Sequence, residues 1–304
     1  MVEHYKGEVL QATSAPELGT GAPGDSFTLR IRVSGQGLKD LVENYPFIFE
    51  VLQPDDIEHT ESEDGGDDLL EDELVLRAPE HEAPAVGVID SGIHERHRWL
   101  SAAVDSSSSE SFVRNDSTVA DQVRRGGHGT RVAGAVLFGE EVPRAGTHQL
   151  PFWVQNARVL DANNGIPREV PPAQLTRAAI LKLRGGSRAT RIFNHSINTK
   201  VPCRLTHMSA WAAEIDLLSF ERDILVVQSV GNLTKETLAS TLNAAAGTPS
   251  APYPAHLDEA SSRVANPAQS LQALSVGSVS YEGFNNGRWQ SFASDRNQPS
   301  AFTR

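Results

Sequence analysis

Cysteine, basic charge and long apolar runs are all scarce in this chain, and each scarcity excludes a class of protein. Cys203 is the single cysteine among 304 residues, so no internal disulfide can form and a reducing compartment is favoured. No stretch approaches the roughly 20 apolar residues of a membrane span, and the first six residues lack the apolar run of a signal peptide. We therefore expect a cytoplasmic protein with no membrane partner.

The net charge of −12 belongs almost entirely to one segment. Residues 55–73 carry eleven Asp and Glu and no Lys or Arg, and subtracting these charges leaves −1 for the rest of the chain. Because no basic stripe remains, we expect no nucleic-acid partner. The acidic segment has too few apolar residues to pack, which predicts a solvated linker, assigned to residues 55–84. Its Asp-Gly-Gly-Asp-Asp core leaves a calcium site as the alternative, although the ligand spacing of an EF-hand loop is absent.

Strand-like and helical patterns alternate from residue 85 onward. Short apolar runs predict strands at 85–90, 152–160, 191–197, 224–230 and 273–279. Helical patterns between them occupy 130–138, 172–183 and 208–221. Apolar strands separated by helices imply a parallel sheet covered on both faces. We predict an α/β fold with a doubly wound parallel sheet over residues 85–304.

A smaller unit precedes the acidic segment. Residues 26–33 alternate between apolar and polar, residues 38–43 favour a short helix, and residues 46–52 are aromatic and β-prone. This pattern predicts a small α+β unit over residues 1–54. Two roles remain as alternatives for this unit: it is a propeptide-like domain, or it is an appendage with no inhibitory role.

Polar residues follow two of the predicted strands. Asp90 ends the run 85–90, and Asn232 closely follows the run 224–230. Ligands of an open parallel sheet gather at the carboxyl ends of its strands, so both residues are candidates for function. Each also has an ordinary structural explanation. Asp90 would cap a helix or form an Asx turn, and Asn232 would adopt a left-handed backbone after glycine.

His128 stands at the entry to a predicted helix, in the string Gly126-Gly127-His128-Gly129-Thr130. Core packing explains a histidine in this setting poorly. The small residues Ala133, Gly134 and Ala135 are expected to let the helix approach the sheet, which sets the imidazole relative to Asp90. A carboxylate that holds one ring nitrogen while the other faces a nucleophile is the arrangement used in nucleophilic catalysis.

Three strings in this order, around Asp90, His128 and Asn232, resemble the subtilisin-like serine proteases. They read Val88-Ile89-Asp90-Ser91-Gly92-Ile93, Gly126-Gly127-His128-Gly129-Thr130-Arg131-Val132-Ala133-Gly134 and Val226-Val227-Gln228-Ser229-Val230-Gly231-Asn232. The resemblance covers residues 85–304 and implies hydrolysis of a peptide or protein substrate. It implies that Asp90 orients the imidazole, that His128 is general base and acid, and that Asn232 donates its amide to the oxyanion.

The family's substrate-binding strand has a counterpart in Asn194-His195-Ser196-Ile197-Asn198. By resemblance, Ser196, Ile197 and Asn198 bind substrate. The family carries glycine where this chain has Asn198, so the pocket is expected to be narrower or more polar than is usual.

The family's nucleophile has no convincing counterpart. It lies in a Gly-Thr-Ser string at the start of a central helix, whereas here only Gly247-Thr248-Pro249-Ser250 is similar. Prolines 249, 252 and 254 cannot enter a buried helix beyond its first turn, which favours a proline-rich surface loop. We therefore expect a serine endopeptidase with an Asp-His-Ser triad whose serine segment is missing from this chain, so that the fragment itself is inactive.

Other functions remain as alternatives. A non-catalytic module that binds a peptide or protein is the second hypothesis, although the presence of Asp90, His128 and Asn232 favours an enzyme. A regulatory partner such as an ATPase is possible beside the acidic segment. His94 and His97 lack the i, i+4 spacing of a zinc protease helix, which favours surface histidines. No metal and no cofactor are expected.

Overall fold

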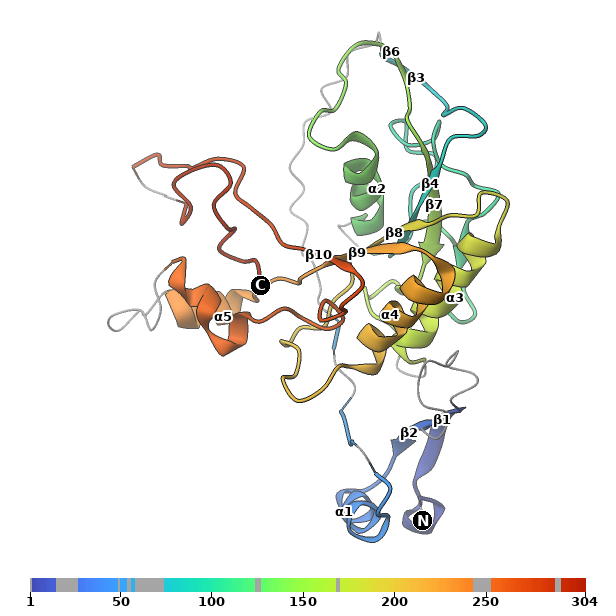
Figure 1. The fold of residues 1–304 in the computed structure, drawn as a ribbon, viewed down its shortest axis with the longest axis vertical. Coiled ribbons are helices and arrows are strands. Elements are labelled where there is room, and N and C mark those ends of the chain that lie inside the picture. The colour runs from blue at the N-terminus through green and yellow to red at the C-terminus, as the bar shows by residue number, and fades with distance from the viewer. Residues whose placement is uncertain are drawn as a thin grey trace.

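A computed structural model describes residues 2–14, 27–48, 50–53, 56–57, 74–123, 127–167, 170–242, 253–287 and 291–304. Its centre is a six-stranded parallel sheet in the order β10-β9-β8-β4-β7-β5 (Figure 1). The strands are β4 (Ala85–Asp90), β5 (Glu110–Ser111), β7 (Trp153–Arg158), β8 (Ile192–His195), β9 (Leu225–Ser229) and β10 (Leu274–Val276). All five predicted strands are present, four of them shortened at their ends, and the α/β prediction is confirmed.

The three predicted helices are also confirmed, as α2 (His128–Phe138), α3 (Pro172–Gly185) and α4 (Ala210–Arg222). Pro172 opens α3 at a position where no helical N–H is needed. Ser209 caps α4, because its hydroxyl accepts the Ala212 N–H at 3.0 Å. The structure adds α5 (Lys235–Leu242) and three short 3-10 turns, Glu3–Tyr5, Ala255–Asp258 and Ala260–Ser262. Among the helices described, none has both the length and the apolar content that a membrane crossing requires.

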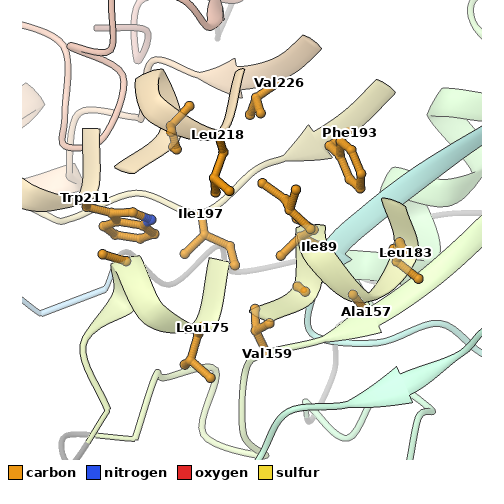
Figure 2. Close-up of a cluster of buried hydrophobic side chains, with 14 of the residues drawn as sticks. Ile89, Ala157, Val159, Leu175, Leu183, Phe193, Ile197, Trp211, Leu218 and Val226 are labelled. Carbon is orange, nitrogen blue, oxygen red and sulfur yellow. The ribbon is translucent and has the colours of Figure 1, made fainter. Parts of the chain in front are cut away.

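Strand β4 is buried on both faces, which places it at the centre of two cores. Ile89 packs with Phe193 and with side chains of α3 and α4 in one cluster (Figure 2). Val88 packs on the opposite face with Ala133 and Leu137 of α2. The alternation of neighbouring residues between two cores fixes which way each side chain of β4 points.

The face that carries α2 is covered over β4 and open over β8, β9 and β10. The register aligns Val88 with Asn194, Val227 and Leu274, so these four residues point to the α2 side. Four apolar side chains on this open face are half exposed: Ile192 at 42%, Leu225 at 40%, Leu274 at 53% and Val276 at 44%. Three adjacent strands therefore present an apolar surface that no described helix covers.

The N-terminal unit differs from its prediction. It contains an antiparallel pair, β1 (Glu8–Ser14) and β2 (Phe27–Arg32), followed by α1 (Gly35–Asn44), which Ser34 caps. The predicted helix at 38–43 is confirmed within α1, and the predicted strand at 26–33 is β2. The predicted strand at 46–52 is wrong for the residues described there, since β2 takes its partner from upstream and Pro46 and Phe47 form an exposed turn.

Two parts of the predicted acidic linker have structure. Ile57 is buried in the same cluster as Ile89, which we call the α3–α4 core, and it forms an isolated antiparallel β-bridge with Thr199. The Lys200 N–H donates to the Asp56 carbonyl at 2.9 Å. Strand β3 (Leu74–Arg77) pairs in parallel with β6 (Gly146–Gln149). A wholly solvated linker over 55–84 is therefore wrong at these positions. The Asp-Gly-Gly-Asp-Asp string lies outside the described residues, so the choice between linker and calcium site stays open.

Candidate active site

Asp90 ends the buried strand β4 and points to the side of the sheet that carries α2. Its side chain is almost wholly buried, and Oδ1 lies 2.7 Å from Nδ1 of His128 and accepts the Ser91 N–H at 2.7 Å. Because an ionised carboxylate only accepts hydrogen bonds, the ring proton sits on Nδ1 and leaves Nε2 for another partner. The carboxylate therefore holds the histidine rather than capping a helix.

His128 is the first residue of α2, and glycines on both sides allow it to reach Asp90. Gly127 has a φ of +50°, a left-handed conformation that favours glycine. A Cβ on Gly129 would lie 2.3 Å from the Gly92 carbonyl oxygen, so only glycine permits this approach. The expectation that Gly134 and Ala135 provide the close approach is wrong, because Gly134 faces open space and Ala135 is exposed. Of the three small residues, only Ala133 packs in the core.

The charge around His128 favours its protonated form. Burial of the ring alone would lower its pKa, but the hydrogen bond and charge of Asp90, helped by the charge of Asp121, outweigh burial and raise the pKa. The side chain keeps 23% of its exposure, which leaves its outer edge open. A ring that binds a proton readily and is held by a carboxylate suits general acid and base chemistry.

Asn232 follows β9 after a glycine with a φ of +88°. The left-handed residue is Gly231 rather than Asn232, so the purely conformational explanation for Asn232 is excluded. A Cβ on Gly231 would lie 2.7 Å from that of Ala265, which makes glycine necessary here. The Arg304 guanidinium donates to the carbonyls of Asn232, Lys200 and Ser261 at 2.9, 2.7 and 2.6 Å. These bonds fasten the backbone of Asn232 to two neighbouring segments.

His128 and Asn232 line one cavity of about 240 Å³ at the carboxyl ends of β8, β9 and β10. The rest of the wall is mostly hydroxyl, amide and glycine, from Ser196, Asn198, Ser229, Thr303 and residues 230–231 and 276–278. Two of the three predicted substrate-binding residues, Ser196 and Asn198, thus face this cavity. The prediction for the third is wrong as regards its side chain, because Ile197 packs in the α3–α4 core.

Asn198 forms part of the cavity wall and is itself held in place. Its side-chain amide donates to the Ser229 carbonyl at 2.8 Å, and its oxygen accepts the Ser229 hydroxyl. The Ser196 hydroxyl donates to Asn194 at 2.9 Å. The wall therefore combines fixed polar groups with the apolar residues Val230 and Val276, and the narrower or more polar pocket expected from Asn198 stays a prediction.

Within the described residues, no serine hydroxyl is hydrogen-bonded to Nε2 of His128. The Gly247-Thr248-Pro249-Ser250 string lies outside the described residues, so its prediction as a surface loop stays a prediction.

The part of the chain that the structure describes contains no group of three or more His, Cys, Asp or Glu residues placed to hold a metal. His94 and His97 are both exposed.

Two residues at this site were not predicted from the sequence. Ser91 and Asp121 are buried beside Asp90 and are hydrogen-bonded to each other at 2.8 Å. Ser91 follows Asp90 directly, which is a local signal. Asp121 lies in a polar stretch with no periodic pattern, and the sequence offers no signal for it.

Comparison with known proteins identifies the family of this chain. The model of the Subtilase family, peptidase S8, matches residues 81–304, and the chain belongs to this family. Among solved structures, the chain is similar to the epidermin leader peptide processing serine protease EpiP from Staphylococcus aureus, with 15% identity and a TM-score of 0.51, covering 99% of this chain and 70% of that one. A mutant of EpiP gives 15% identity and a TM-score of 0.50, over 91% of this chain and 66% of that one. At these identities the likeness concerns the fold alone. A search of curated proteins found no match.

Proposed function

We propose that this chain carries the acid, base and oxyanion-binding parts of a subtilisin-like serine endopeptidase. The observation that carries the proposal is the 2.7 Å contact between Asp90 and His128, with His128 and Asn232 on one cavity. Membership of the subtilase family supports serine-peptidase chemistry on a peptide or protein substrate. That the whole protein hydrolyses a peptide or protein substrate is part of the same proposal.

In the proposed reaction, Nε2 of His128 removes the proton from a serine hydroxyl as its oxygen attacks the scissile carbonyl. Asp90 stabilises the resulting imidazolium through Nδ1, and the amide of Asn232 donates to the oxyanion. The imidazolium then gives its proton to the leaving amine, which forms an acyl-enzyme. Water attacks the ester with His128 again as base, and the serine is regenerated.

We propose that the serine belongs to a segment outside residues 1–304 that packs on the open face of β8, β9 and β10. The exposed side chains of Ile192, Leu225, Leu274 and Val276 support this position, because they would bury about half of their surface under an apolar helix. Ser229 and Val276 are paired in the strand register and lie on this same face, and both line the cavity together with His128. A helix on this face would therefore begin beside the base.

The cavity wall supports a preference for a small substrate side chain that carries no positive charge. Asn198 and Ser229 occupy each other's hydrogen-bonding groups, so they add bulk and leave few free donors. Among the described residues that line the cavity, none is Asp, Glu, Lys or Arg. A positively charged side chain would find no partner of opposite charge among these residues.

The test is labelling with a fluorophosphonate, which reacts with an activated serine. The 304-residue chain is compared with a version extended by any sequence that its gene encodes beyond residue 304, and adducts are mapped by mass spectrometry. We expect labelling of the extended form alone, lost in His128→Ala and retained in His97→Ala, which removes an exposed histidine.

Other outcomes would contradict the proposal. An adduct on the 304-residue chain would show that the nucleophile lies within it. An extended form that contains a serine segment and is not labelled would favour the non-catalytic binding module. That second hypothesis has one observation in its favour, namely that no described serine is hydrogen-bonded to Nε2 of His128.

A further inference from the structure

A second buried carboxylate lies behind the pair of Asp90 and His128. Asp121 is 4% exposed, and it comes from the loop that precedes α2 rather than from the sheet. Its Oδ2 accepts the Ser91 hydroxyl proton at 2.8 Å, and its Oδ1 accepts the Val123 N–H at 2.9 Å. Neither bond is explained by the proposed reaction, in which Asp121 has no step.

Ser91 links this carboxylate to both parts of the site. Its backbone N–H donates to Oδ1 of Asp90 at 2.7 Å, and its hydroxyl oxygen accepts the Gly129 N–H at 3.0 Å. Because ionised Asp121 can only accept, it takes the Ser91 proton and directs a lone pair of the hydroxyl to Gly129. The direction of the Ser91 hydroxyl is therefore set by Asp121.

The Gly129 N–H needs such an acceptor. The first N–H groups of a helix have no partner within it, and the residue that caps α2 is Gly127, which has no side chain. Ser91 supplies the missing cap from a neighbouring loop. A second bond from the same loop reaches the next residue, since the His94 N–H donates to the Thr130 hydroxyl at 3.0 Å. The first turn of α2, which carries His128, is thus held from outside.

The charges agree with this arrangement. Burial raises the pKa of Asp121, and the charge of Asp90 raises it further, whereas the bonds from Val123 and Ser91 and the charge of His94 oppose the rise. Asp121 in turn acts with Asp90 to raise the pKa of His128, against the charge of Arg131. Two nearby carboxylates favour the imidazolium more than one does.

We propose that Asp121 is a positioning residue for His128, acting through the Ser91 hydroxyl on the Gly129 amide. It holds the first turn of α2 where Nδ1 of His128 meets Asp90. The proposal rests on the proposed role of His128 as the base. It concerns the ring's position and proton affinity, which are measurable without turnover.

The experiment measures two quantities in the 304-residue protein: the pKa of His128 by NMR titration of labelled histidine, and the hydrogen-exchange rate of the Gly129 amide. For Asp121→Asn we expect a lower pKa of His128 and an exchange rate of Gly129 that rises roughly tenfold, as for the loss of one hydrogen bond. Ser91→Ala should change both quantities in the same directions. The double variant should exchange Gly129 no faster than Ser91→Ala alone, because the two residues act in series.

Glu141→Gln is the matched control, because it removes one negative charge at an exposed residue beyond the far end of α2. It should change neither quantity. If Asp121→Asn folds and leaves either the His128 pKa or the Gly129 exchange rate unchanged, the proposal is overturned. If Asp121→Asn does not fold, the same two quantities are measured in Ser91→Ala, and an unchanged value of either overturns the proposal. None of these results depends on whether the extended protein hydrolyses peptides.

Discussion

Acid should destabilise this protein through His195, a fully buried ring at the end of β8, just before the cavity residues Ser196 and Asn198. Nδ1 lies 2.7 Å from Oε1 of Gln228, and Nε2 lies 3.3 Å from the Thr176 hydroxyl, which also accepts the Trp211 N–H at 2.8 Å. The Gln228 amide donates to the Ile197 and Ser229 carbonyls, so its oxygen is an acceptor and Nδ1 carries the single ring proton. This network satisfies the neutral ring and provides no place for a charge.

Burial lowers the pKa of His195 to about 4, against partial opposition from Gln228 and Asp90. Above the ordinary value of 6.5, neither the folded nor the unfolded state binds the proton, and stability is unaffected. Below 6.5 the unfolded state binds a proton that the folded state does not, so the free energy of unfolding falls until the pH reaches about 4. A difference of about 2.5 pKa units corresponds to roughly 3 kcal/mol.

The assay is urea unfolding of the 304-residue protein at a series of pH values from 7 to 4, beside His195→Asn. The asparagine amide can still donate to Gln228, so the variant removes the titrating group while it keeps one bond. We expect the stability difference between wild type and variant to shrink by roughly 3 kcal/mol across this range, since only the wild type has a ring to protonate. Groups that titrate in both proteins, such as His128 and Asp121, cancel in the difference. His97→Asn is the matched control for loss of an exposed imidazole. A difference that does not change with pH would refute the reasoning.

Three further predictions concern the site. Gly129→Ala should lower the free energy of unfolding by roughly 1–3 kcal/mol and lower the pKa of His128, because the added methyl would push α2 off the loop that follows Asp90. Gly134→Ala, on an open part of the same helix, should raise the free energy of unfolding by up to about 1 kcal/mol. Equal effects of the two substitutions would contradict the close approach of Gly129 to Gly92. Gly231→Ala should cost about 1–2 kcal/mol for its left-handed backbone alone, measured by urea unfolding, and no cost would show that the turn before Asn232 is relaxed. In an extended, active form, Asn198→Gly should raise kcat/KM roughly tenfold for larger substrate side chains, and an unchanged preference would show that this residue does not limit the cavity.

The sheet could be predicted because its central strands are short apolar runs between helical patterns. Strands β3 and β6 escaped prediction for a physical reason: β6 is exposed along its length, so burial leaves no pattern in its residues. The strand predicted at 46–52 failed because aromatic composition says nothing about which segment pairs with β2. That partner is β1, whose pairing depends on contacts between distant residues.

The site was only partly predictable. Asp90, His128 and Asn232 stand at the ends of recognisable elements, so position in the sequence marks them. Asp121 joins Ser91 across 30 residues through a loop with no regular structure, and no local pattern records such a contact.

The register of β4 is what makes this set of contacts possible. Neighbouring residues of β4 enter opposite cores, with Ile89 packed against α3 and α4 and Val88 packed against α2. Asp90, one residue further, must therefore face the α2 side, where His128 lies. A slip of one residue in β4 would turn Asp90 into the opposite core and leave a carboxylate among apolar side chains. The two cores thus determine where the carboxylate points, and the glycines at 127 and 129 bring the histidine to it.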